Sequence, residues 1–423
     1  MLKKFIGLIS ILCTIDVAAH DCTTLPASLQ QFVDGKQAGE YRVANDVGGA
    51  TISVSNDLAF THYIENTKAL IEARNKRAYL PCPLPRLTQS QGQATKVADH
   101  LAPYELKQTN DNKAILLIHG LTDSPYIFNA VAHDLYKQGF NVRTLLLPGH
   151  GTAADDLRHV SNQDWQQHVQ YAIKRTAADF KQFAIMGFST GAALATIEVS
   201  KSRPKNLAAL VLVAPATESH NKKSWLAQWV DWLPFVDWLD KDADLDFAKY
   251  ESFPLAAAAL VHNVMVEMMN TQVPNDLPVL AIMSDVDATI DSQATLKLLS
   301  RWAEKHSAEI ALRLYANNQV AVSDGIAVTQ VSQLEKIKDM SHVGLLMPPE
   351  HPYYGETGHY RHCGSYFEDN NAYAACKNAK NVSFGEHHAE NKAADTPLAR
   401  ATFNPDYTGM ITQLTAFLDN HVR

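Results

Sequence analysis

The stretch FAIMGFSTGAALATIEV, residues 183–199, decides the fold of this chain of 423 residues. An apolar run leads into Gly187, and a segment rich in small residues begins after Gly191. A serine between two such glycines, at the junction of a strand and a helix, is typical of a sharp turn that projects the serine oxygen above the sheet. On this stretch alone, two interpretations of Ser189 stay open: a nucleophile, or a polar residue that caps a helix.

The sequence around this stretch alternates between strand and helix patterns. Continuous apolar runs, of the kind buried in parallel sheets, occur at 114–118, 141–147, 183–187, 207–214 and 278–283. Helical patterns lie between them at 126–138, 163–181, 190–202 and 292–306. Strands that alternate with helices predict an α/β fold, with a doubly wound, mostly parallel sheet and helices on both faces.

A nucleophilic serine needs a base that removes its proton and a carboxylate that orients the base. On this kind of sheet the expected order along the chain is serine, acid, histidine. Asp287 stands in the turn after the run at 278–283, and His342 follows later in KIKDMSHVGLL. Neighbours of the same types stay open as alternatives: Asp285 and Asp291 for the acid, and His351 and His359 for the base.

Two backbone N–H groups should bind the negative charge that develops on the substrate oxygen. Thr190 follows the serine directly, and Leu121 lies in HGLTDSP, residues 119–125, the loop after the first strong strand. We expect these two residues to form the oxyanion hole. In the same loop we interpret His119 as a residue that shapes the turn, and Asp123 as a turn cap.

The motifs HGLTDSP, LLLPGHGT (145–152) with Trp165 downstream, GFSTG and SHV, in this order, resemble those of the α/β-hydrolase family. Within it the chain is similar to carboxylesterases, monoacylglycerol lipases and serine aminopeptidase-like hydrolases, over roughly residues 113–347 and the last helix. The resemblance implies a catalytic triad and two oxyanion donors, namely Ser189, Asp287 and His342, and Leu121 and Thr190. It implies neither a cofactor nor a metal.

Two features depart from that family. The long separation between Asp287 and His342 predicts an additional hairpin near 310–332, and residues 20–100 and 348–400 match no family pattern. The expected division of the chain is a signal peptide at 1–19, an N-terminal extension at 20–112, the hydrolase core at 113–216 and 277–347, a lid insertion at 217–276, a disulfide-pinned insertion at 348–400 and a C-terminal core helix at 401–423.

The predicted lid holds four of the six tryptophans of the chain, Trp225, Trp229, Trp232 and Trp238. The first three fall on one face of a helix. Two interpretations remain: plain packing of the lid, or an acyl-binding wall that also contacts lipid, since tryptophan suits an apolar–water boundary. Either one favours an apolar substrate over a charged one.

The first residues read as an export signal. Lys3 and Lys4 precede a short apolar run, and Val17 and Ala19 suit a cleavage site after Ala19. The run is too short to span a bilayer comfortably. We therefore expect a periplasmic or secreted protein with no transmembrane segment after cleavage.

Cysteine usage fits an exported chain. Of the five cysteines, Cys13 leaves with the signal, and the remaining four allow three disulfide pairings. We favour Cys22–Cys82 and Cys363–Cys376, because the second pair closes a short local loop.

Composition narrows the function further. The chain is 46% hydrophobic and 19% charged, as globular proteins are, and its net charge of −8 argues against nucleic-acid binding. Five histidines of the 348–400 segment could suggest zinc, namely His351, His359, His362, His387 and His388. No pair shows the metalloprotease arrangement with a glutamate, so a disulfide-pinned surface loop is the favoured interpretation.

These patterns predict an exported serine hydrolase that cleaves carboxylic esters with an apolar acyl chain, such as a monoacylglycerol or lysolipid, with lipid contact through the lid. An aminopeptidase-like peptidase is the first alternative, since DKDADLD (240–246) could hold a substrate amine. A non-catalytic binding protein on the same fold is the second. An organophosphonate should label Ser189 in an enzyme and not in a binding protein.

Overall fold

The computed structural model describes most of the chain, namely residues 21–24, 39–45, 49–85, 95–220, 238–242, 244–366, 369–388, 391 and 396–423. The predicted signal peptide at 1–19 lies outside these residues, as do Trp225, Trp229 and Trp232 of the predicted lid. Within the described residues, no helix combines the length and the apolar character needed to cross a bilayer.

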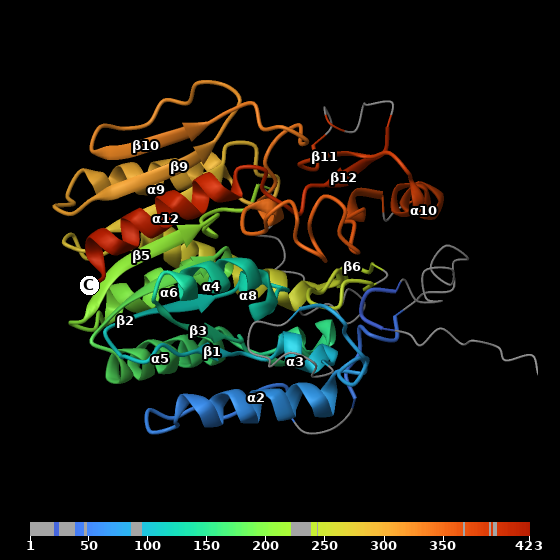
Figure 1. Cartoon of the computed structure of the whole chain (residues 1–423), viewed down its shortest axis with the longest axis horizontal. Coiled ribbons are helices and arrows are strands. Elements are labelled where there is room, and N and C mark those ends of the chain that lie inside the picture. Colours follow the sequence, from blue (N-terminus) through green and yellow to red (C-terminus); the bar gives the residue numbers. More distant parts are fainter. Residues whose placement is uncertain are drawn as a thin grey trace, which may run out of the picture.

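An eight-stranded sheet forms the centre of the described structure (Figure 1). Its strands, in chain order, are β1 (Glu105–Leu106), β2 (Lys113–Ile118), β3 (Asn141–Leu145), β4 (Gln182–Phe188), β5 (Leu207–Val213), β8 (Val279–Ser284), β9 (Ile310–Tyr315) and β10 (Ile326–Val331). Their spatial order is β1-β3-β2-β4-β5-β8-β9-β10. Only the pairing of β1 with β3 is antiparallel, so the predicted doubly wound, mostly parallel sheet is confirmed.

The inner strands β2, β5 and β8 bury side chains on both faces, which is why their sequences are almost continuously apolar. In β2, Ala114, Leu116 and Ile118 face one apolar core, and Ile115 and Leu117 face the other. Helices α5 (Asn162–Asp179), α6 (Thr190–Lys201), α8 (Leu255–Asn270) and α9 (Ser292–Ala303) pack into the first core, and α4 (Asn129–Lys137) and α12 (Tyr407–His421) into the second. The predicted helices are therefore present, with bounds that differ by a few residues.

The hairpin predicted near 310–332 is wrong. β9 and β10 lie in this range but run parallel, with Ile310 opposite Ile326. All six residues of β9 are buried, so β9 is an interior strand. The chain returns along the sheet between the two strands, and β10 then adds a parallel edge.

The N-terminal residues pack onto the sheet through α2 (Phe60–Arg74) and α3 (Val97–Leu101). α2 ends at Arg74, before the prolines of LPCPLPR (80–86). Asn75 closes the helix, and its side-chain amide donates to the carbonyl of Gly151 (2.8 Å). The Arg74 guanidinium donates to the carboxylate of Asp156. The extension thus braces the loop that follows β3.

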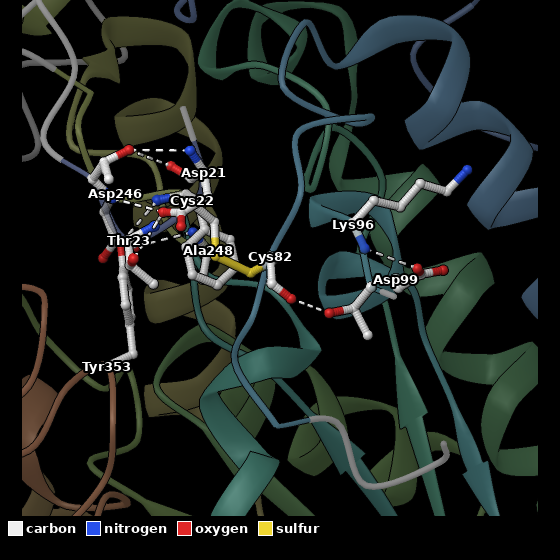
Figure 2. Close-up of a disulfide and its surroundings, with 12 residues drawn as sticks. Asp21, Cys22, Thr23, Cys82, Lys96, Asp99, Asp246, Ala248 and Tyr353 are labelled. Atoms are coloured by element: carbon white, nitrogen blue, oxygen red, sulfur yellow. Dashed lines mark hydrogen bonds between the residues drawn. A yellow bond between two sulfur atoms is a disulfide. The ribbon is translucent and has the colours of Figure 1, made fainter. Parts of the chain in front are cut away.

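Both favoured disulfides are present, Cys22–Cys82 and Cys363–Cys376. Figure 2 shows the first one, which ties the N-terminal residues to the segment around Cys82. The second joins α10 (Asn370–Asn378) to the chain before it. The predicted pairing is confirmed.

Two small sheets lie outside the central one (Figure 1). In the predicted lid, β6 (Trp238–Asp240) pairs with β7 (Phe253–Pro254), directly before α8. Near the C-terminus, β11 (Ser383–Gly385) runs parallel to β12 (Leu398–Arg400), with Gly385 opposite Arg400. This second sheet brings the residue after β11, Glu386, next to the loop that follows β8.

Candidate active site

Ser189 lies in the turn between β4 and α6, with φ 51° and ψ −117°, a backbone conformation that residues other than glycine rarely adopt. A Cβ on Gly187 would lie 2.4 Å from the backbone of α6, and one on Gly191 would lie 2.2 Å from the carbonyl oxygen of Ile118. Only glycine fits at these two positions. The Ser189 side chain makes no capping bond to α6, which argues against the interpretation of this serine as a helix cap.

His342 and Asp287 come together although they lie far apart in sequence. His342 Nδ1 donates to Asp287 Oδ2 (2.6 Å), and both side chains are buried. The other Asp287 oxygen accepts the N–H groups of Thr289 and Ile290 (2.7 and 2.9 Å). The His342 ring packs against Phe188, the neighbour of Ser189, with 5.1 Å between ring centroids.

No hydrogen bond between Ser189 Oγ and His342 is present among the described residues. Catalytic bonds of this kind are often long until substrate binds. Because Nδ1 of His342 is engaged by Asp287, Nε2 is the nitrogen left to accept a serine proton.

The residues left open as alternatives to Asp287 and His342 make different contacts. Asp291 caps α9 by accepting the N–H groups of its first turn. Asp285 is half-buried in the turn after β8, where burial raises the pKa of its carboxyl. His351 is buried and its Nδ1 accepts two backbone N–H groups, whereas His359 is exposed. The structure brings only His342 of these histidines to Asp287.

Two buried histidines hold the loop after β2. The His119 ring accepts the N–H of Leu147 at Nε2 (3.0 Å), which leaves Nδ1 to donate to the carbonyl of Gly120 (2.8 Å). His150 Nε2 accepts the N–H of Thr122 (3.1 Å). Burial lowers the pKa of both imidazoles, to about 4 for His150 and well below the usual range for His119. Both rings are therefore neutral and fix backbone groups of this loop.

The predicted oxyanion donors lie on either side of Ser189. Thr190 is the first residue of α6, and the N–H groups of a first helical turn have no intrahelical partner. The Leu121 N–H donates no backbone hydrogen bond within the described chain. A Cβ on Gly120 would lie 3.0 Å from Cβ of Ser189, so the loop carrying Leu121 passes directly beside the serine.

Sequence reasoning did not find two charged residues that support this site. Glu386 is fully buried and its carboxylate accepts the N–H of His342 (3.0 Å) and that of Ala288 (3.3 Å). Arg400 donates from Nε to Glu386 (2.6 Å) and from Nη2 to the Thr289 hydroxyl (2.7 Å). No local motif marks either residue, because their contacts cross long stretches of chain.

Two carboxylates of the 240–246 segment, those of Asp244 and Asp246, are engaged inside the protein. Asp244 is buried, accepts from Arg42 Nε (3.2 Å) and accepts the Ser252 hydroxyl (2.5 Å). Asp246 is fully buried and accepts the Tyr354 hydroxyl (2.8 Å); burial raises the pKa of its carboxyl to about 7. These groups are not free to hold a substrate amine.

The described part of the predicted lid gives one tryptophan a packing role. The Trp238 ring is half-buried, and the Arg42 guanidinium carbon lies 5.4 Å from its centroid. Among the described residues, no group of three or more acidic, histidine or cysteine side chains could hold a metal ion.

Comparisons with known proteins find hydrolases. Residues 109–317 match the family described as serine aminopeptidase, S33. The chain is 22% identical over 184 residues, 43% of its length and 73% of the relative's, to a thermostable monoacylglycerol lipase of Bacillus sp. (strain H-257). Among solved structures, a monoacylglycerol lipase of Paleococcus ferrophilus is 16% identical, with 64% of this chain and 98% of that chain covered and a TM-score of 0.41. A metagenome-derived lipolytic enzyme is also 16% identical, with 54% of this chain and 86% of that chain covered and a TM-score of 0.43.

Proposed function

Because this chain is an α/β-hydrolase of the esterase and lipase family, we propose that it is an exported serine hydrolase that cleaves carboxylic esters with an apolar acyl chain. Ser189 attacks the acyl carbon while His342 removes its proton, and Asp287 orients His342 and stabilises its cationic form. The N–H groups of Leu121 and Thr190 bind the oxyanion. Water activated through His342 then hydrolyses the acyl-enzyme.

One observation carries the proposal: a histidine bonded to a buried aspartate through Nδ1 lies against the residue that precedes a strained serine. This arrangement leaves Nε2 of His342 available to act as the general base. Backbone strain is commonly retained where it positions a functional group. The order Ser189, Asp287, His342 along the chain adds independent support.

The choice of substrate rests on two further points. The relative that matches by sequence is named a monoacylglycerol lipase, which supports an ester with an apolar acyl chain. Two carboxylates of the segment that could hold a substrate amine, those of Asp244 and Asp246, are bonded within the protein. We therefore place an ester ahead of a peptide. Lipid contact through the lid tryptophans remains part of the proposal.

Export is supported by the two disulfides, which persist mainly in oxidising compartments. The predicted signal at 1–19 is consistent with this location. Mass spectrometry of the protein recovered from the periplasm or the medium tests it: we expect a chain that begins at His20, and a full-length chain in the cytoplasm would overturn the prediction.

The central test is hydrolysis of p-nitrophenyl esters from acetate to palmitate. We expect turnover by the wild type, an optimum at a medium or long chain, and loss of turnover to the uncatalysed rate in Ser189→Ala. Ser200→Ala is the matched control, since it removes an exposed serine from the same helix and should keep full activity. An optimum at acetate would contradict the apolar acyl site.

Labelling by an organophosphonate separates an enzyme from a binding protein without any assumption about the substrate. We expect one label per chain, on Ser189, in the wild type and in Ser200→Ala. A wild type that takes up no label, or labels elsewhere, would reject the nucleophile. Label without ester turnover would move the function to aminoacyl substrates.

A further inference from the structure

The Glu386 carboxylate joins the two halves of the acid–base pair. Its oxygen Oε2 accepts the N–H of His342 (3.0 Å) and the N–H of Ala288 (3.3 Å), the residue after Asp287. His342 and Asp287 are 55 positions apart, and β9 and β10 lie between them. A single buried atom therefore connects the backbones that carry the two partners.

Arg400 completes this connection. It binds both oxygens of Glu386, from Nε to Oε1 (2.6 Å) and from Nη2 to Oε2 (2.9 Å). Its Nη2 also donates to the hydroxyl of Thr289, whose N–H is bonded to Asp287. The acid loop is thus held at Ala288 by the glutamate and at Thr289 by the arginine.

The Glu386 carboxylate accepts many hydrogen bonds, and the Glu386 backbone is also bonded. It accepts five N–H groups, those of Arg400 Nε and Nη2 and of the backbones of Ala288, His342 and His387. Burial alone would raise the pKa of Glu386, but the Arg400 charge and these donors outweigh it and lower the pKa to about 2. The N–H of Glu386 donates to Asp339 (2.6 Å), which also binds His388 (2.7 Å).

We propose that Glu386 and Arg400 are positioning residues for catalysis, which hold His342 and the loop of Asp287 at bonding distance. This inference rests on the proposed function, because it takes these two residues as the base and the acid. A buried ion pair is a costly way to pin a surface segment, since apolar side chains would stabilise it as well or better. Geometric control of a reacting pair is a role that fixed hydrogen bonds serve better than apolar contacts.

The charges near His342 make the proposal testable through its pKa. Asp287 binds its ring, and Glu386, which is paired with Arg400, binds its backbone N–H. Asp339 interacts with Asp285 and binds His388 and the Glu386 N–H. Glu386 and Arg400 carry opposite charges and form an ion pair. Removing either charge alone should therefore shift the pKa of His342, and in opposite directions.

The direction of the expected change in the pKa of His342 depends on which charge each variant leaves behind. Glu386→Gln leaves Arg400 uncompensated, which disfavours imidazolium, so the pKa of His342 should be lower in this variant than in the wild type. Arg400→Gln leaves Glu386 uncompensated, and the pKa should be higher than in the wild type. Arg400→Lys keeps the charge but loses the two-point contact, so the pKa should stay near that of the wild type.

The experiment measures the His342 imidazole directly by NMR in the full chain labelled at histidine, with His342→Gln to assign the signal. It also measures kcat and KM against pH. We expect kcat to fall about 10- to 100-fold in all three variants, with KM within a factor of about three, because the acid–base geometry is lost and not the binding of substrate. Glu356→Gln, which breaks an exposed ion pair with Lys336 in the same segment, is the control and should change nothing.

Opposite pKa shifts in the two charge variants, with retention in Arg400→Lys, would establish the role. Shifts of the same sign, or wild-type kcat and pKa in folded variants, would overturn it. The NMR readout needs no substrate, so a protein that hydrolyses no ester refutes the proposed function while this inference is still decided. If Glu386→Gln fails to fold, the contrast between Arg400→Gln and Arg400→Lys decides it alone.

Discussion

The two sides of the candidate site are built by different physical means. The side that carries Ser189 is held by sterics and neutral groups: glycines at 187 and 191 that nothing larger could replace, and the uncharged rings of His119 and His150. The acid–base side is held by charge, through the Glu386–Arg400 pair. Both sides join distant segments: His119 binds Leu147 across 28 positions, and Glu386 binds His342 across 44.

This difference predicts distinct responses to mutation and pH. Substitutions on the serine side should act by collision or by a lost neutral hydrogen bond, with no dependence on pH near neutrality. Substitutions on the acid–base side should act through lost charges and charged hydrogen bonds, with effects that depend on pH. Each prediction below tests one side of this contrast.

The largest effect is expected from Gly191→Ala. A Cβ there would lie 2.2 Å from the Ile118 carbonyl oxygen, a backbone atom that cannot move aside without displacing β2. We expect a loss of at least about 4 kcal/mol in the free energy of unfolding and no organophosphonate label on Ser189. Urea unfolding and labelling measure the two effects.

Gly49→Ala is the matched control, because a Cβ at that position would meet no atom within 4 Å. It should leave stability and labelling as in the wild type. A labelled, stable Gly191→Ala protein would show that the turn is more adaptable than its packing indicates. It would contradict the view that sterics hold the serine side of the site.

The next largest effect is expected on the acid–base side, in the stability of the protein at low pH. The pKa of Glu386 is lowered to about 2 from an ordinary value near 4.5, so the folded state holds this carboxylate ionised more firmly than the unfolded chain does. Its contribution, roughly 3 kcal/mol, is present above the unfolded pKa and is lost as pH falls from about 4.5 to 2. We expect the stability difference between wild type and Glu386→Gln to shrink over that window.

Urea unfolding at several pH values from 6 to 3 measures this difference. Glu356→Gln, at an exposed carboxylate, should give a difference that is small and nearly constant with pH. A Glu386→Gln difference that stays flat across the window would mean that the glutamate is held by packing and not by charge.

The contrast also explains how far the sequence could be interpreted. The order of strands and helices, the turn at Ser189 and both disulfides follow from local patterns and were predicted. The role of Glu386 was not, because a glutamate followed by two histidines has no periodicity or motif that would point to His342. The parallel pairing of β10 was missed for a similar reason: hydrophobic pattern indicates a strand but not the direction of its neighbour.

A smaller effect is expected from His150→Ala, which leaves the Thr122 N–H without its acceptor beside the predicted oxyanion loop. An unpaired buried N–H costs about 2 kcal/mol, which corresponds to roughly a 30-fold fall in kcat if the loop must relax. Because burial lowers the pKa of His150 to about 4, the ring is neutral from pH 5.5 to 9, and the ratio of variant to wild-type rates should be constant there.

Rates across this pH range test the point, with His133→Ala as the control at an exposed histidine of α4. A ratio that changes by more than a few fold with pH would show that His150 carries charge in the working enzyme. The serine side would then depend on electrostatics as the acid–base side does.

The smallest effect is expected from Thr289→Val, which removes the hydroxyl that Arg400 Nη2 binds but leaves the Glu386–Arg400 pair intact. Thr289 is exposed, so water can replace the lost partner, and we expect a cost of about 0.5 kcal/mol, a two- to threefold fall in kcat, with KM unchanged. Thr412→Val, at an exposed threonine that bonds only within α12, should have no effect. A fall of thirtyfold or more in Thr289→Val would mean that the arginine orients Asp287 mainly through this hydroxyl, and the glutamate would then serve to hold the arginine and not the acid loop itself.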